Sequence, residues 1–198
     1  KSDRVLLKIL NAPWMIEWFE KNYEAKIVTI LRHPAAQALS VLRQGWDFPV
    51  KAYIERASEL EHFFSPRQID LIRSAANGND KWKIAIADWI ITSHPLRNFG
   101  AEGVIRIKYE DIVYDPEIFV ENKLVKELQL NDRDAMLNSI GNPSGSSIMS
   151  EDHIKTAIQK RSIEKLIWGW GAFVDREMAI NAQKTLDFFE VTEYSFGV

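Results

Sequence analysis

The sequence predicts an α/β protein in which a short parallel sheet is flanked by helices in three layers. Two observations predict this class: short runs rich in β-branched residues, and intervening segments with helical apolar spacing that are too long for hairpin loops. Strands separated by helices imply parallel pairing through crossover connections. With 198 residues, 46% of them hydrophobic, the chain is long enough for one sizeable core, so we expect a single domain over residues 1–198.

Short apolar runs mark the expected strands, and longer segments with helical spacing mark the expected helices. The strands are Arg4–Lys8, Lys26–Leu31 and Val104–Tyr109. The helices are Ala12–Tyr23, Pro34–Gln44, Val50–Phe64, Pro66–Ala76 and Asn79–Arg97. The chain after these segments is expected to be mostly helical. Asp115-Pro116-Glu117 predicts a helix start, with Asp as the N-cap and Pro in the first turn, and the turn formers of Asn142–Ser147 predict a loop.

Tryptophan is abundant, with seven residues in the chain. Trp82 and Trp89 lie seven positions apart in a helical pattern with isoleucines, which predicts a core stripe. We expect Trp14, Trp18 and Trp46 to pack in the core too. The alternative is that these three line an acceptor pocket of aromatic or lipid character.

Composition excludes several classes of protein. A formal net charge of -3 argues against general binding of nucleic acid or anionic membranes, although a local cationic pocket remains possible. The absence of cysteine excludes disulfides and thiolate metal sites. No apolar run reaches transmembrane length, and the charged start Lys1-Ser2-Asp3-Arg4 lacks the apolar segment of a signal peptide. The expectation is a cytoplasmic protein without a metal or a membrane span.

The most informative stretch is the expected strand Lys26–Leu31 followed by Arg32-His33-Pro34. Proline at the first position of the next helix places Arg32 at the carboxyl end of the strand. Open α/β sheets bind ligands at that end. The fixed fork of donors on arginine suits a phosphate, and the backbone N–H groups at the start of the next helix would add to such an anion site. The alternative is a solvated or salt-bridged surface arginine.

Arg32, Pro34 and Ser40 together resemble the 3′-phosphate-binding segment of sulfotransferases that use 3′-phosphoadenosine 5′-phosphosulfate (PAPS). Further segments are similar to this family in the same order. Lys108-Tyr109-Glu110-Asp111 with the later Asp115-Pro116 resembles its Tyr-Glu-Asp-Leu segment, and Phe196-Gly197-Val198 is like the closing segment of many bacterial members. The resemblance runs from about Lys8 to the end of the chain and implies a partial sulfotransferase fold of the P-loop-NTPase-like type.

The resemblance implies roles for five residues. Arg32, Ser40 and Arg161, which lies seven residues before Trp168, would hold the 3′-phosphate, and Tyr109 would contact the adenine. Lys8, 24 residues before Arg32, stands at the place of the catalytic lysine and would contact the bridging oxygen as it becomes anionic.

Each role has an ordinary structural alternative. Ser40 would lie roughly 8 to 9 Å along a helix beginning near Pro34, so spacing alone does not bring it to Arg32. The alternative for Ser40 is an exposed or backbone-bonded serine, and the alternative for Tyr109 is a ring that covers the core. For Lys8 the alternative is a solvated side chain, and for Arg161 it is a place on a solvated basic helix face. Glu110 and Asp111 are expected to be turn and capping groups rather than catalytic carboxylates.

Two departures from the family pattern matter. The chain contains no Lys-Ser-Gly-Thr type segment to cradle the 5′-phosphosulfate, so we expect a longer enzyme of which this chain is the carboxyl-terminal portion. Leu10 stands where cytosolic members have a histidine base, and none of His33, His62, His94 and His153 lies in a motif that assigns it that role.

The expected function is transfer of a sulfuryl group from PAPS, as co-substrate, to a hydroxyl or amine of a small-molecule or glycan acceptor. The alternative is a non-catalytic sulfotransferase-like module that binds an adenine nucleotide or a protein partner. An unrelated P-loop kinase fold is disfavoured because the chain has no Gly-x-x-x-x-Gly-Lys-Ser/Thr motif. The acceptor and the oligomeric state stay open.

Overall fold

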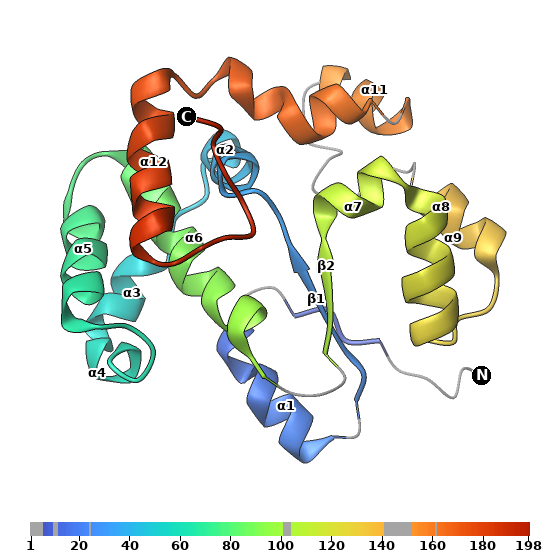
Figure 1. Ribbon diagram of the computed structural model, residues 1–198, viewed down its shortest axis with the longest axis horizontal. Coiled ribbons are helices and arrows are strands. Elements are labelled where there is room, and N and C mark those ends of the chain that lie inside the picture. The colour runs from blue at the N-terminus through green and yellow to red at the C-terminus, as the bar shows by residue number, and fades with distance from the viewer. Residues whose placement is uncertain (1–5, 10–11, 24, 101–103, 141–151, 161) are drawn as a thin grey trace.

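The computed structural model describes residues 6–9, 12–23, 25–100, 104–140, 152–160 and 162–198, and its helices surround a short parallel sheet (Figure 1). Up to residue 98 the elements are η1 (Pro13–Met15), α1 (Ile16–Asn22), β1 (Ile27–Leu31), α2 (Pro34–Gln44), α3 (Val50–Glu55), α4 (Ala57–Leu60), α5 (Pro66–Asn77) and α6 (Lys81–Asn98). From residue 104 they are β2 (Val104–Lys108), α7 (Tyr109–Tyr114), α8 (Pro116–Phe119), η2 (Val120–Glu127), α9 (Arg133–Ile140), α11 (Asp152–Gln159), η3 (Glu164–Trp168), η4 (Gly169–Ala172) and α12 (Arg176–Phe188). The expected α/β class is confirmed, with the predicted loop Asn142–Ser147 outside the described residues.

The sheet of the described residues consists of β1 and β2, which pair in parallel. Their register places Ile27 opposite Val104 and Leu31 opposite Lys108. Both strands therefore end at the same level, and the residues that follow them emerge at the same edge. Figure 1 shows α2, α6 and α12 on one side of the sheet and α7, α8 and α9 on the other.

The two faces of β1 differ in burial. Thr29 and Leu31 are buried on the side of α6, and Thr29 Oγ1 lies 3.5 Å from the carbonyl oxygen of Leu96. Val28 and Ile30 point to the opposite face, where they are 36% and 55% exposed. Their register partners on β2, Ile105 and Ile107, are buried on that face. The described elements therefore cover this face of the sheet at β2 and leave it exposed at β1. The sequence predicts a strand covered on both faces, as in most parallel sheets, and this part is not observed.

The expected strand Arg4–Lys8 is wrong for the residues that the structure describes. Leu6, Leu7 and Lys8 have no regular structure, and the two leucines are 94% and 67% exposed. A strand needs a neighbouring strand to bond its backbone, and β propensity alone does not supply one. In Figure 1 this segment runs across the lower half of the strands, far from their upper, carboxyl ends.

Helix starts follow the predicted capping chemistry closely. α2 begins at Pro34 as expected, and α5 begins after Ser65 in a capping box with Gln68. The Asp115 carboxylate accepts from the Ile118 N–H at 2.9 Å, which confirms the predicted N-cap of α8. The expected helix Val50–Phe64 is interrupted at Arg56, where the backbone leaves helical geometry and separates α3 from α4.

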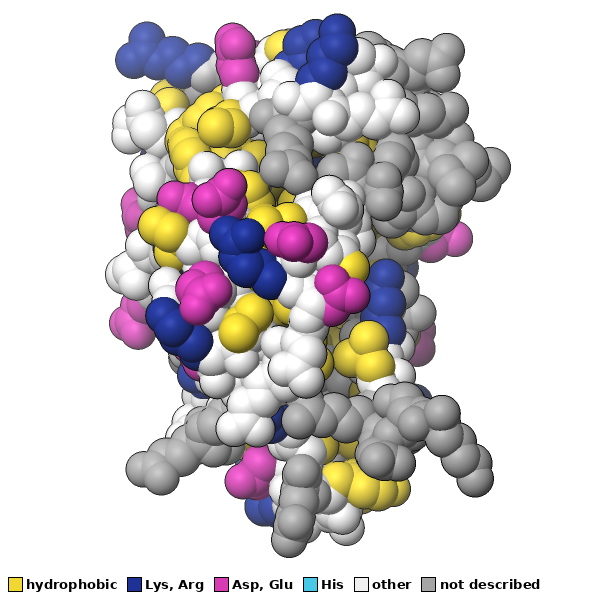
Figure 2. All heavy atoms as spheres, turned by 90° about the vertical axis from the view of Figure 1, so that its right-hand side faces the viewer, with side chains coloured by type: hydrophobic (Ala, Val, Ile, Leu, Met, Phe, Trp, Pro, Cys, Tyr) yellow, Lys and Arg dark blue, Asp and Glu magenta, His cyan; other side chains and the backbone are white. Residues whose placement is uncertain are grey.

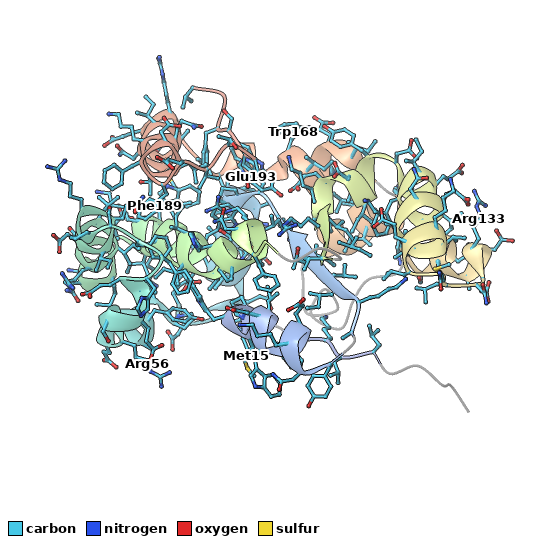
Figure 3. All side chains as sticks on the ribbon, turned by 60° about the horizontal axis from the view of Figure 1, so that its bottom comes forward. Met15, Arg56, Arg133, Trp168, Phe189 and Glu193 are labelled. Carbon is cyan, nitrogen blue, oxygen red and sulfur yellow. The ribbon has the colours of Figure 1, made fainter. Side chains whose placement is uncertain are left out.

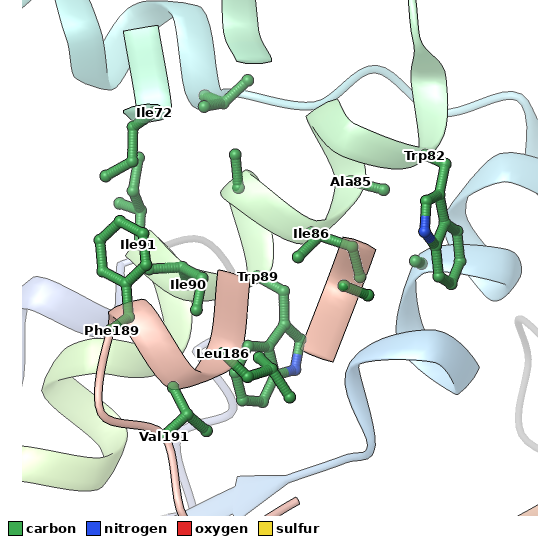
Figure 4. Packing of buried hydrophobic residues seen from close by; sticks show 14 of the residues in the cluster. Ile72, Trp82, Ala85, Ile86, Trp89, Ile90, Ile91, Leu186, Phe189 and Val191 are labelled. Carbon is green, nitrogen blue, oxygen red and sulfur yellow. The ribbon is translucent and has the colours of Figure 1, made fainter. Parts of the chain in front are cut away.

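The core is built around α6, which packs against η1, β1, α2, α3, α5 and α12. Trp89, Ile90 and Ile91 are at most 1% exposed, so this helix is buried on nearly all sides. Figure 4 shows Leu186 of α12 and Val191 beyond it close to Trp89. Full burial of one such side chain contributes about 1.5–3 kcal/mol to the free energy of folding. The predicted core stripe of Trp82 and Trp89 is confirmed.

The expectation of core packing fails for two of the remaining tryptophans. Trp14 packs against the core, in contact with the ring of Phe63 at 4.6 Å. Trp18 and Trp46 are 47% and 56% exposed. Apolar atoms make up more than half of a folded surface, so an exposed large side chain needs no special explanation.

The outer helices α8, η2 and α9 carry charges of both signs. Arg133 lies 3.9 Å from carboxylate oxygens of Glu117 and Glu121, and Lys123 bonds Glu127 at 2.6 Å. Figure 2 shows acidic and basic side chains side by side on the right-hand face of the molecule. Exposed pairs of this kind contribute little to stability. Within the described residues, no helix is long and apolar enough to cross a membrane.

Asp88 is a buried carboxyl in α6 that makes folding stability depend on pH. It accepts from the Val50 N–H, but its Oδ1 has no hydrogen-bond partner among the described residues, and burial raises its pKa from 3.8 to about 7. Between these values the native state keeps a proton that the unfolded state has lost. The contribution of Asp88 to the free energy of unfolding should therefore be greatest below pH 4 and should fall as the pH rises towards 7.

We expect Asp88→Asn to remove this dependence and to stabilise the protein above pH 7 by up to about 4 kcal/mol. Urea unfolding at several pH values between 4 and 8 measures the difference between the variant and the wild type. His94, whose pKa burial lowers to about 4, contributes the opposite slope to both proteins and cancels in that difference. Parallel pH profiles for the two proteins would contradict the assignment.

Candidate functional site

The carboxyl ends of β1 and β2 bring two of the predicted site residues together. Arg32 follows Leu31 and Tyr109 follows Lys108, and these two strand ends are register partners. The Arg32 Cζ lies 4.6 Å from the centroid of the Tyr109 ring, a cation–π contact. The expected place of Arg32 at the carboxyl end of a strand is confirmed, and the structure adds that Tyr109 lies at the same edge.

Arg32 has no anionic partner within the described part of the chain. Its Nε is buried there without a hydrogen-bond partner, and its side chain forms no ion pair with a described carboxylate. Its backbone is held by the Trp89 indole, which donates to the Arg32 carbonyl oxygen at 3.0 Å. A buried N–H without an acceptor costs about 1–3 kcal/mol, so an anion at this position would relieve that cost.

Two other cations near this edge are held by Glu193. Arg97 pairs with the Glu193 carboxylate at 3.5 Å, and its side chain is 4% exposed. Lys108 donates to the Glu193 carbonyl oxygen at 3.1 Å. Of these three cations, Arg32 alone has neither an ion pair nor a side-chain hydrogen bond to a described residue.

Glu110 ties the two strand ends to the segment after α12. Its carboxylate accepts from the His33 backbone N–H at 2.8 Å and from the Tyr194 hydroxyl at 3.0 Å, and the residue is 9% exposed. Burial and the neighbouring Glu110 charge raise the pKa of Tyr194, which therefore stays protonated as the donor. Both carboxylate oxygens are bonded, in line with the expectation that Glu110 is structural rather than catalytic.

His33 caps α2 and was not singled out by the sequence. Its Nδ1 accepts from the Ala35 N–H at 3.2 Å, which assigns the proton to Nε2 as donor to the Ser195 carbonyl oxygen, also at 3.2 Å. Burial lowers its pKa and favours this neutral form. The Trp170 ring stacks on it at 4.6 Å. Histidine is an unusual N-cap, so only its position before Pro34 could have signalled the role.

This cap changes the expected anion site at the start of α2. Pro34 has no N–H, and the N–H of Ala35 is bonded to His33. The first turn of α2 therefore contributes less to an anion site than the sequence predicts, and Arg32 carries more of it.

The segment η3–η4 lies over the carboxyl edge of the sheet. It contacts α7 through η3 and α2 through η4, and Figure 1 shows it passing above both helices. The Trp168 indole donates to the Tyr114 hydroxyl at 3.2 Å, and the Arg43 guanidinium lies 4.3 Å from the centre of the Phe173 ring. Figure 3 places Trp168 on the same side of the molecule as Glu193. Aromatic rings of this segment thus contact the two helices that follow the strands, a feature that spacing in the sequence did not reveal.

The remaining predicted site residues are not brought to Arg32. Ser40 lies on α2 with its hydroxyl 3.5 Å from the Gln44 amide nitrogen, and no contact links it to Arg32. Lys8 is exposed in a segment without regular structure, rather than at a strand end as predicted. Arg161 lies outside the described residues. No group of three or more His, Asp or Glu side chains among the described residues is arranged to hold a metal ion.

Comparisons of the chain with protein-family models, with curated proteins and with solved structures find no match. The resemblance to PAPS-dependent sulfotransferases therefore stays a prediction that rests on the residues of this chain.

The bond between Tyr194 and Glu110 should stabilise the fold measurably. We expect Tyr194→Phe to lower the free energy of unfolding by about 1–3 kcal/mol, because it leaves a buried carboxylate oxygen without a donor. Urea denaturation measures the loss, and Tyr23→Phe, at an exposed ring, is the matched control. Combining Tyr194→Phe with Glu110→Gln should cost less than the sum of the two single changes. Equal effects of Tyr194→Phe and Tyr23→Phe would refute the role of this bond.

Proposed function

We propose that the chain binds the 3′-phosphate of PAPS at Arg32 and is the carboxyl-terminal portion of a sulfotransferase. The observation that carries this proposal is the Arg32 guanidinium, which lies at the carboxyl end of a parallel strand with a buried N–H and no described anionic partner. Ligands of open α/β sheets bind at that end of the strands. A 3′-phosphate carries nearly two negative charges and matches the fork of donors on arginine.

Tyr109 supplies an aromatic surface beside this phosphate position. The Arg32 guanidinium covers one face of its ring, so an adenine would stack on the other face. The cation–π contact also holds the guanidinium in place before a ligand arrives, which lowers the entropy cost of binding.

Sulfuryl transfer needs alignment and positive charge around the reacting oxygens more than acid–base chemistry, as in phosphoryl transfer. In this proposal Arg32 and Tyr109 fix the nucleotide end of PAPS, and Lys8 meets the bridging oxygen. The acceptor is a hydroxyl or amine whose class stays open. Lys8 would have to leave its exposed position in the described structure to take this role.

The second candidate is a nucleotide-binding module without transferase activity. It is favoured by the exposed position of Lys8 in a segment without regular structure. Both candidates share the site at Arg32, so a binding experiment tests that site and an activity experiment separates the two functions.

Calorimetry with adenosine 3′,5′-bisphosphate and adenosine 5′-phosphate tests the site. We expect a clear preference for the bisphosphate and a loss of roughly 10- to 100-fold in its affinity in Arg32→Ala, the scale of a charge-assisted hydrogen bond. Arg32→Lys should recover only part of the loss, because an ammonium lacks the planar fork. Arg56→Ala is the control, since Arg56 lies on the opposite side of the molecule from Trp168 and Glu193 (Figure 3). Equal affinity for the two nucleotides would sink the assignment.

Release of adenosine 3′,5′-bisphosphate from PAPS in the presence of hydroxyl and amine acceptors separates enzyme from module. The enzyme predicts turnover that Lys8→Ala lowers while bisphosphate affinity stays unchanged, because the lysine acts on the transition state and not on the 3′-phosphate. Nucleotide binding without any turnover would favour the module.

A further inference from the structure

Residues of α5, α6 and α12 line a trough in which α6 forms the floor. Figure 1 shows these three helices grouped on the side of the sheet away from α8 and α9. The two walls are antiparallel. The Gln68 amide at the start of α5 donates to the Phe188 carbonyl oxygen at the end of α12 at 3.2 Å, while the Trp82 indole of α6 donates to the Met178 carbonyl oxygen near the start of α12 at 3.3 Å. Between these two hydrogen bonds lies a hollow of about 350 Å³.

Short side chains create this space. Ala75 of α5, Ala87 of α6 and Ala182 of α12 line the hollow, together with Gly78 after α5. Figure 4 shows the larger apolar side chains Ile72, Ile86 and Phe189, which also line the hollow, at the junction of the three helices. The interior of the trough is therefore mostly apolar and is shaped by the backbones of three packed helices.

The open end of the trough carries unpaired positive charge. A second hollow lies against the first, with which it shares Leu71, Ser74 and Thr185, and it is lined also by Arg67 and Lys184. Both cations are exposed, and within the described residues neither forms an ion pair or a side-chain hydrogen bond.

One acidic side chain also lines this end. Asp70 borders the second hollow, but it bonds Arg73 at 2.6 Å, which balances its charge. The charge left at the mouth is therefore positive.

The first hollow has the size and lining of a small-molecule site. Such sites have volumes of about 300–1,000 Å³ and are mostly apolar with a few placed polar groups. A hollow of about 350 Å³ with this lining therefore suits a small amphiphile.

We infer that this trough binds an anionic amphiphile, with its alkyl chain on the floor of α6 and its carboxylate between Arg67 and Lys184. The apolar interior would remove the chain from water, and the two cations would pair with the head group at the solvent-exposed end. The site is independent of the proposed nucleotide site, because no residue lines both.

Calorimetry with decanoate below its micelle concentration tests the inference, with decanol and decyltrimethylammonium as neutral and cationic counterparts of equal chain length. We expect saturable binding of decanoate, weaker binding of decanol by roughly tenfold, and the weakest binding for the cation. Ser74→Trp should abolish binding, because Ser74 is exposed and borders both hollows, so the indole fills the trough without disturbing buried residues.

Charge reversal gives the second test. Arg67→Glu combined with Lys184→Glu should weaken decanoate binding by roughly tenfold or more and should narrow its advantage over decanol, whereas Lys160→Glu, at an exposed lysine beyond α11, should change neither. Circular dichroism confirms that each variant is folded.

Three results would overturn the inference. The first is decanoate binding that does not saturate, and the second is a decanoate affinity that Ser74→Trp leaves unchanged. The third is that decanoate and decanol bind with equal affinity and that the charge-reversal variant binds both as the wild type does. A monomer–dimer equilibrium that Ser74→Trp abolishes without any amphiphile would assign the trough to a second copy of the chain instead, and would also overturn it.

Discussion

The geometry of the candidate site depends on one buried carboxylate. Glu110 follows β2, yet its two oxygens bind the backbone after β1 and the hydroxyl of Tyr194. The carboxylate can be buried here because a donor reaches each of its oxygens. Removing either donor would leave the oxygen that it bonds without a partner in a low-dielectric interior. The relative positions of Arg32 and Tyr109 follow from the pairing of the two strands, and this bridge links the residues beyond the strand ends. A substitution at Glu110 would therefore disturb the site without touching a ligand.

Charge compensation around the strand ends is uneven, and the functional proposal depends on that difference. Arg97 and Lys108 are both bonded to Glu193, so they are part of the structure that holds the closing segment, residues 191–198. Arg32 rests on an aromatic ring, which weakly stabilises a cation but does not neutralise it. The same edge of the sheet thus has two cations bonded to the closing segment and one, Arg32, whose side chain makes no hydrogen bond to a described residue.

Local chemistry predicted the elements and two residues of the site, and non-local contacts determined the rest. Pro34 and Asp115 mark helix starts in their own sequence neighbourhood, and Pro34 also places Arg32 at the end of a strand. The roles of His33 and Glu110 depend on Ser195 and Tyr194, which lie 162 and 84 residues away along the chain. No spacing rule reaches that far. The strand expected around Lys8 failed for the same reason, because a strand forms only where another strand offers its backbone.

The long reach of the closing segment also bears on how the molecule folds. Its contacts with residues 33, 108 and 110 close loops of 84 to 162 residues, and closing such loops costs chain entropy before any contact repays it. Of the helices around α6, α2, α3 and α5 lie close to it in the chain, whereas α12 contacts it across 96 residues. The corner that holds Arg32 therefore depends, like the docking of α12, on the closure of long loops, so the ordering of this corner is coupled to that of the last helix.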